Sequence, residues 1–297
     1  MKKRSARIAP AVALACLVWT ASGGVAQAGG PWLDRVRAFE PGVSSGFGAD
    51  QLPGIVLGRP QGLGPNQGSV DVVSLGHGGR IVASFDNNAV VDGEGDDLVI
   101  FENAFVTGQS VFTELAFVEV SADGREWVEF PYDASTGKGL AGRTPVMSNA
   151  INGRDPLDEA SGGDRFDLAD VGLEFVRYVR ITDAGSLIDD LGNHVFPGTK
   201  GGFDLDAAAA IHSTNLGCIS GTVSHAGEAL VGVRVRLSGD ASTRRRRTGV
   251  GGKYRFCRLR PGLDYSVTAK APGYENATEG AYLDDAQLRV RLDLFMN

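Results

Sequence analysis

Side chains that commonly carry catalysis or bind transition metals are scarce in this sequence. Its 297 residues include 3 cysteines and 4 histidines, with no Cys-x-x-Cys pair and no cluster of histidines, which excludes a zinc finger. The His-Glu-x-x-His motif of zinc proteases is also absent. We therefore assign no catalytic residues and expect a non-catalytic protein.

Long apolar runs are missing beyond the first 28 residues, so no later segment approaches the roughly 20 apolar residues that span a membrane. The start itself has four cations among its first seven residues, an apolar run at 9–19 and a small-x-small site at 26–28. This pattern predicts a secretory signal peptide at 1–28 and a mature chain outside the cytoplasm, either extracellular, at the cell surface or in the periplasm. Cys16 in the apolar run leaves a lipid-attachment site as an alternative.

Removal of the signal peptide leaves two cysteines, Cys218 and Cys257. In an oxidising compartment the simplest arrangement is one disulfide between them, and two buried thiols are the alternative. A disulfide would also leave no thiol nucleophile in the mature chain.

Positive charge is missing from much of the N-terminal part, since no Lys or Arg occurs between Arg80 and Arg125. Residues 29–216 hold 12 Lys and Arg against 28 Asp and Glu, a net charge of −16, whereas residues 217–297 hold 13 against 8, a net charge of +5. This asymmetry predicts two modules, and the acidic one is unsuited to nucleic acid. We interpret the run Arg244–Arg247 as a solvated hairpin tip, with contact to an anionic surface as the alternative.

Helical periodicity is scarce, and short apolar or alternating runs separated by turn residues predict an all-β chain of sandwich type. Asp123-Gly124 marks a hairpin. A short helix is expected at 32–39 and a long surface loop at 143–163. The strands of the N-terminal module are expected at 69–75, 80–85, 97–101, 116–121, 126–130, 175–183 and 205–212.

The C-terminal module has a more specific pattern. It reads Gly-x-Val at 221–223, Gly-Val-x-Val-x-Leu at 232–237, Gly-x-Tyr-x-Phe-x-x-Leu at 252–259, Pro-Gly at 261–262 and Tyr-x-Val at 265–267. This resembles the carboxypeptidase regulatory-like, prealbumin-like domain, except that 247–251 lacks the usual Asp. The resemblance implies a small β-sandwich at 216–297 that serves as a structural or spacer module.

Acidic residues gather in three segments of the N-terminal module, at 96–103, 162–170 and 201–207, the last two sharing Gly-Gly and Phe-Asp-Leu. Clustered carboxylates repel one another unless a cation joins them, and calcium takes six to eight oxygens from carboxylates, amides and carbonyls. Solvated turns and strand caps are the alternative, which we assign to Asp92 and Glu94. We therefore predict structural Ca²⁺ bound by residues from Asp96, Asp97, Glu102, Asp164, Asp167, Asp204 and Asp206.

The N-terminal module carries two resemblances. Phe-Glu-Asn-Ala-Phe at 101–105 and Gly-Gly-Phe-Asp-Leu-Asp at 201–206 resemble a family of uncharacterised exported bacterial surface proteins. The patterns at 118–127 and 177–181 are similar to galactose-binding-like jelly rolls. The second resemblance implies a jelly roll at 29–215, often with structural calcium and with glycan binding at its loops.

Together these observations predict an exported, non-catalytic protein of the cell surface or extracellular space that binds a glycan or another surface protein. Loop character places a sugar site at Tyr132–Arg143 and Phe196–Lys200. Two alternatives stay open: a hydrolase that acts on glycans with a pair of carboxylates, and a purely structural surface component.

Overall fold

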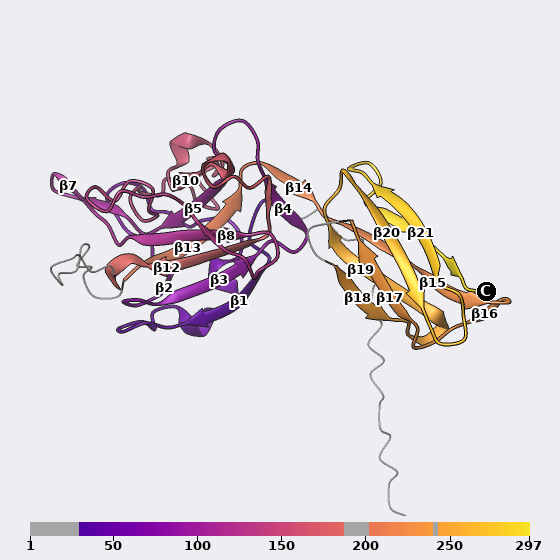
Figure 1. The fold of residues 1–297 in the computed structure, drawn as a ribbon. Coiled ribbons are helices and arrows are strands. Elements are labelled where there is room, and N and C mark those ends of the chain that lie inside the picture. The colour runs from indigo at the N-terminus through magenta and orange to yellow at the C-terminus, as the bar shows by residue number, and fades with distance from the viewer. Residues whose placement is uncertain (1–29, 187–201, 240–242) are drawn as a thin grey trace, which may run out of the picture.

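The computed structural model describes residues 30–186, 202–239 and 243–297, so the predicted signal peptide, Cys16 and Phe196–Lys200 lie outside the described residues. These ranges hold strands and short 3-10 helices, with no α-helix and no helix able to cross a membrane. Figure 1 shows two groups of strands joined near β14 and β15. The all-β fold class is therefore confirmed. The first group, at 30–216, is called the acidic module here, and the second, at 217–297, the basic module.

The acidic module is built from three antiparallel sheets, of order β1-β3-β12-β8-β9, β10-β5-β13-β2 and β11-β4-β14, and from a separate hairpin β6-β7. Neighbouring strands are often distant in sequence, as in β3 with β12 and β5 with β13. Its strands are β1 Arg35–Glu40, β2 Val73–Ser74, β3 Arg80–Ser84, β4 Asn88–Val91, β5 Leu98–Glu102, β6 Phe105–Thr107, β7 Ser110–Phe112, β8 Ala116–Ser121, β9 Val128–Glu129, β10 Asp164–Phe166, β11 Phe175–Val176, β12 Tyr178–Asp183, β13 Asp204–Ala210 and β14 Ser213–Asn215. Its 3-10 helices are η1 Ala49–Gln51, η2 Gly54–Val56, η3 Glu159–Ser161, η4 Leu168–Val171 and η5 Ala184–Ser186.

The main core of the acidic module lies between the sheets that contain β12 and β5. Strand β12 alternates between half-exposed and buried residues, as a sheet with one covered face requires. Strand β5 is buried along its whole length because its two faces join different clusters. Leu98 and Ile100 enter the main core, while Val99 and Phe101 pack with Ala207 and Ala209. This central position carries the acidic end of β5 into the protein interior.

The helix expected at 32–39 is wrong, because β1 pairs with β3 as the edge strand of the five-stranded sheet. Val36 and Phe39 pack against the core, which outweighs the weak helical pattern. The hairpin at Asp123-Gly124 is confirmed: β8 pairs with β9, and Gly124 adopts φ 77. The stretch 143–158 holds no strand or helix, as expected for the long loop.

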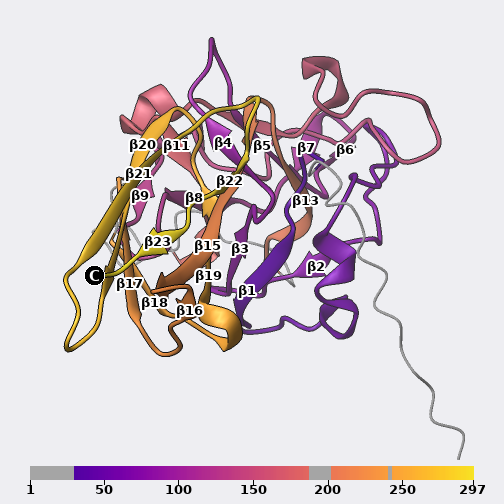
Figure 2. The same ribbon diagram turned by 90° about the vertical axis from the view of Figure 1, so that its right-hand side faces the viewer.

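The basic module is a smaller sandwich of two sheets around its own core. One sheet contains β16, β15 and β19, with β22 and β23 on β15, and the other has the order β18-β17-β20-β21. Figure 2 views this module end-on. Its strands are β15 Gly217–His225, β16 Glu228–Ala229, β17 Arg234–Ser238, β18 Arg244–Arg247, β19 Lys253–Leu259, β20 Leu263–Lys270, β21 Ala277–Leu283, β22 Arg289–Arg291 and β23 Leu294–Phe295, with one 3-10 helix, η6 Val250–Gly252.

The disulfide and the arginine run of the basic module can be compared directly with the sequence predictions. Cys218 and Cys257 are bonded and occupy facing positions of β15 and β19, with 4.0 Å between their Cα atoms. The predicted disulfide is therefore confirmed. The run Arg244–Arg247 is an edge strand, β18, where a solvated hairpin tip had been expected. Three of its four arginines are exposed, and the half-buried Arg244 donates to the Cys257 carbonyl of β19 at 2.8 Å.

Candidate functional site

Three buried oxygen atoms without hydrogen-bond partners lie where β5 meets the start of β13. They are Oε2 of Glu102, Oδ1 of Asn103 and Oδ1 of Asp204, and none is bonded within the described part of the chain. The register places Glu102 opposite Leu205, directly after Asp204, and a register shift between Leu205 and Ala207 bends the strand at this point. Since buried polar groups are normally paired, three unpaired acceptors on adjoining residues indicate a missing donor or cation.

The electrostatics of this oxygen cluster support a missing positive charge. Burial raises the pKa of Glu102 well above its usual range, and Asp204, Glu114 and Asp164 raise it further by their negative charges. Burial also raises the pKa of Asp204, against the lowering effect of hydrogen bonds with Ser74 and Asn103. Within the described ranges, neither Glu102 nor Asp204 forms an ion pair. Carboxylate and amide oxygens are the ligands that calcium prefers, so these residues fit it.

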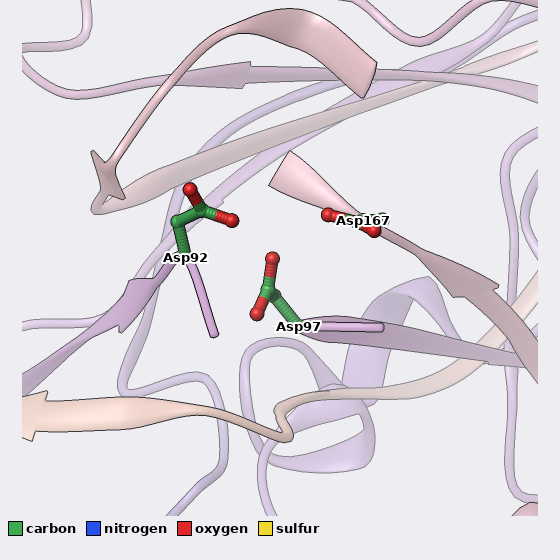
Figure 3. A group of neighbouring side chains, drawn as sticks. All are labelled: Asp92, Asp97 and Asp167. Carbon is green, nitrogen blue, oxygen red and sulfur yellow. The ribbon is translucent and has the colours of Figure 1, made fainter. Parts of the chain in front are cut away.

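A second acidic group consists of Asp92, Asp97 and Asp167. Each residue contributes one carboxylate oxygen, and these three oxygens all lie within 4.8 Å of one another. Figure 3 shows the three carboxylates directed toward a common space. Asp97 is fully buried, and its oxygens accept hydrogen bonds from Gly93 N and Leu168 N at 2.8 Å, with His212 Nδ1 also at 2.8 Å. Asp167 caps η4 by accepting from the amide of residue 169. Protein donors thus already stabilise this group, and Asp92, assigned to a solvated turn from the sequence, belongs to it.

Two further predicted ligands hold backbone amides of loops. Asp164 Oδ2 accepts from Gly142 N at 2.7 Å and Arg143 N at 2.8 Å, and its Oδ1 accepts from the Thr144 hydroxyl at 2.8 Å. Asp206 accepts from Gln61 N with both oxygens, at 3.1 and 2.9 Å. Burial raises the pKa of Asp206 to about 8, and the charge of Asp71 adds to the effect. Of the seven predicted ligands, Glu102 and Asp204 therefore belong to one cluster and Asp97 and Asp167 to another, while Asp96 and Asp164 line a cleft.

That cleft lies in the acidic module and has a volume of about 700 Å³. The loop expected at a sugar site contributes Tyr132, Lys138 and Arg143 to its wall. Facing residues come from η3, η4 and β10, among them Glu159 and Arg165. The cleft is thus a mixed polar surface with one tyrosine, Tyr132, whose ring is tilted against that of Phe117 at 5.0 Å between ring centroids. Such a surface offers both donors and acceptors to a hydroxylated ligand.

One serine motif was not identified from the sequence. Residues 42–46 match Gly-x-Ser-x-Gly, the spacing of a nucleophile elbow, and Ser44 has φ 65. The elbow needs a turn from a strand into a helix, but Ser44 is exposed in the loop between β1 and η1. Within the described ranges no histidine or acidic side chain is hydrogen-bonded to it. The match therefore has neither the local fold nor the partners of a hydrolase nucleophile.

The comparisons with known proteins bear mainly on the basic module. Residues 218–296 match the carboxypeptidase regulatory-like domain family, which confirms the resemblance stated for that module. A search of curated proteins found no match to the chain.

Among solved structures, a DUF3823 family protein from Parabacteroides merdae is 15% identical over 28% of this chain and 47% of its own, with a TM-score of 0.24. The present chain thus spans about half the length of that protein. The dioxygenase domain of a carbohydrate-binding fusion protein from Streptomyces sp. SirexAA-E is 18% identical over 27% and 78%, with a TM-score of 0.23. The pilus 2b backbone protein of group B streptococcus is 12% identical over 81% and 96%, with a TM-score of 0.26. At these scores the likenesses carry no conclusion about function.

Proposed function

We propose that this is an exported, non-catalytic binding protein whose acidic module is held together by calcium and takes up a glycan in its cleft. The observation that carries the proposal is the set of three buried, unpartnered oxygens of Glu102, Asn103 and Asp204. A buried carboxylate with no counter-charge costs several kcal/mol or stays protonated. Bound calcium supplies the missing charge and coordinates oxygens of these types.

Calcium bound at Glu102 would also affect the structure of the cleft. The negative charge of Asp164 reaches Glu102 and raises its pKa. Asp164 in turn accepts from the amides of Gly142 and Arg143, and Arg143 lines the cleft. Residue 116 pairs with residue 141 across an isolated bridge, next to the buried Glu114. A cation at Glu102 would therefore stabilise the segments that shape the cleft. Glycan binding should depend on calcium for this reason.

The direct test is thermal unfolding of the mature protein in calcium and in chelator. Calcium at a hundredfold excess over its dissociation constant adds about 2.7 kcal/mol of stability, which corresponds to a rise of several degrees. Glu102→Gln and Asp204→Asn should each abolish most of this rise. Glu94→Gln is the matched control, because Glu94 is an exposed acid of the same acidic run. An equal calcium response in wild type and both variants would refute the site.

Glycan uptake is tested by binding to an array of neutral and acidic oligosaccharides, in calcium and in chelator. Tyr132→Ala and Arg143→Ala should weaken binding of a cleft ligand, whereas Glu94→Gln should not. A calcium response without any glycan binding would leave the third interpretation, a purely structural surface component.

One observation favours the alternative of a glycan hydrolase. The cleft is lined by the carboxylates of Asp96, Asp133, Glu159 and Asp170. Asp164 is unsuited to act there, because three backbone amides and a threonine hydroxyl surround its oxygens. Release of reducing sugar from a bound oligosaccharide, lost in Glu159→Gln or Asp170→Asn, would favour the hydrolase. Binding without release favours the non-catalytic protein.

A further inference from the structure

The outer face of the β15 sheet in the basic module is lined with cations. Lys253 and Arg255 lie on β19, Arg289 and Arg291 lie on β22, and all four are exposed. The inward positions of the same strands, such as Tyr254 and Phe256, are buried in the core. The alternation therefore places these four charges on the solvent side, whereas Arg258 at the end of β19 pairs with Asp86.

The register brings these cations around a floor of short side chains. Ser220 of the central strand β15 lies opposite Arg255 on one side and Arg291 on the other. Thr222 lies opposite Lys253 in the next row. Neighbouring strands are about 4.8 Å apart, so the two arginines stand roughly 10 Å from each other across the serine. Long side chains on both sides of short ones leave a groove.

The edge strand β18 supplies one wall of this groove. Arg246 and Arg247 line it together with Lys253, Arg255 and Arg291, around a volume of about 390 Å³. No carboxylate is among the lining residues. Arg291 pairs with Asp293 at 2.9 Å, whereas Lys253, Arg246 and Arg255 form no ion pair within the described ranges. Like charges on adjacent strands repel one another, so an anion would relieve a repulsion that Asp293 compensates only at Arg291.

The lining also indicates which kind of anion fits. Tyr254, the aromatic side chain there, is 5% exposed and donates its hydroxyl to the Leu292 carbonyl, so the groove offers no exposed ring on which bases could stack. It likewise has no apolar pocket for the aromatic anchor of a protein partner. Guanidinium forks suit carboxylates and phosphates alike, and the hydroxyl of Ser220 suits a hydroxylated chain.

We propose that this groove binds an acidic polysaccharide through its carboxylates. The inference rests on the proposed function only in taking the protein to be an exported binder, because the groove shares no residue with the calcium cluster or the cleft. The carboxypeptidase regulatory-like module then contributes a binding site of its own. Lys253 and Arg255 would contact successive carboxylates of the chain.

The test measures binding of hyaluronan oligosaccharides to the full mature protein by calorimetry at low salt, with neutral dextran as the uncharged probe. The double variant Lys253→Ala, Arg255→Ala should lose at least about tenfold in affinity, as expected for two charge-assisted contacts. The matched control is Arg234→Ala, Lys270→Ala, which removes two exposed charges paired on the opposite sheet of the same module. The control should lose less than about threefold.

Each outcome decides the proposal. Equal losses in both double variants would show general attraction to a positive module and overturn the groove. Binding of dextran as tight as that of hyaluronan would overturn the requirement for carboxylates. Self-association in sedimentation, abolished by Lys253→Ala, Arg255→Ala, would assign the groove to a second copy of the chain. Repeating the titration in chelator separates the two proposals, because groove binding should persist when calcium-dependent cleft binding is lost.

Discussion

Arg258 of β19 donates to Oδ2 of Asp86 at 2.7 Å, which ties the basic module to the loop between β3 and β4 of the acidic module. Asp86 also pairs with Arg35 and Arg37, and Arg177 lies 3.8 Å away. One largely buried carboxylate therefore balances cations from both modules. Burial lowers the pKa of Arg177, and the positive charges of Arg244 and Arg258 act in the same direction.

We predict that Asp86→Ala costs about 3 kcal/mol or more of the free energy of unfolding, because it leaves the buried Arg177 and the partly buried Arg37 side chain without a counter-charge. Arg258→Ala should cost about 1 kcal/mol or less, since its side chain is 40% exposed. Urea unfolding measures both. Glu40→Gln is the control: its ion pair with Arg80 is exposed and 3.7 Å long. A loss for Asp86→Ala no larger than that control would contradict a central role for this carboxylate.

A second prediction concerns Asp97, which joins Gly93, Leu168 and His212. Asp97→Ala should cost about 3–5 kcal/mol, because it leaves the buried Leu168 amide, the partly buried Gly93 amide and His212 unpaired. The loss should be the same in calcium and in chelator, which separates Asp97 from Glu102. Asp92→Ala, at the exposed member of the same group, should change stability by about 0.5 kcal/mol or less. A calcium response that disappears in Asp97→Ala would move the calcium site to the group in Figure 3.

Much of the fold was predictable because it depends on local pattern. Alternation along Tyr178–Asp183 and the turn at Gly124 both encode their structure within a few residues. The Arg35–Glu40 strand was not predictable in this way, since its conformation depends on pairing with β3, some 45 residues later. Propensity cannot report a partner so distant in sequence.

The candidate sites were likewise predictable only where they depend on local sequence. The acidic segments of the sequence indicated Glu102 and Asp204 as candidate ligands. Only the pairing register of β5 and β13 brings these two residues close to each other. The sequence indicated Asp164 as a candidate ligand for the same reason. In the structure its carboxylate accepts a hydrogen bond from the Gly142 amide, and no residue near it in sequence predicts that contact. The basic groove depends on strand order as well, because Arg255 and Arg291 reach Ser220 from opposite sides.

The disulfide gives a third prediction. Cys218 and Cys257 are 39 residues apart in sequence, and closing a loop of that length stabilises a protein by about 3–4 kcal/mol through the unfolded chain. The double variant Cys218→Ser, Cys257→Ser should lower the free energy of unfolding of the basic module by this amount. Reduction of the wild type should have the same effect and leave the double variant unchanged. A reductant effect on the double variant would point to a cause other than this bond.

The fourth prediction concerns the pH dependence of stability in chelator. Asp206 keeps its proton in the folded protein up to about pH 8, whereas the unfolded chain releases it near the ordinary value of 3.8. Between those two values the folded state binds more protons than the unfolded state, so the free energy of unfolding should fall as pH rises from about 4 to about 8. Below and above that window Asp206 contributes no further change.

Asp206→Asn removes this titration, so the variant should lose less stability than the wild type between pH 5 and pH 8. Chemical unfolding at closely spaced pH values measures the difference. Asp71→Asn removes the neighbouring charge that raises the pKa of Asp206 and should flatten the profile in part. Asp293→Asn is the control, because Asp293 is on the other module and its pKa is lowered by Arg291. An identical slope in wild type and Asp206→Asn would mean that Asp206 is ionised in the folded protein at neutral pH.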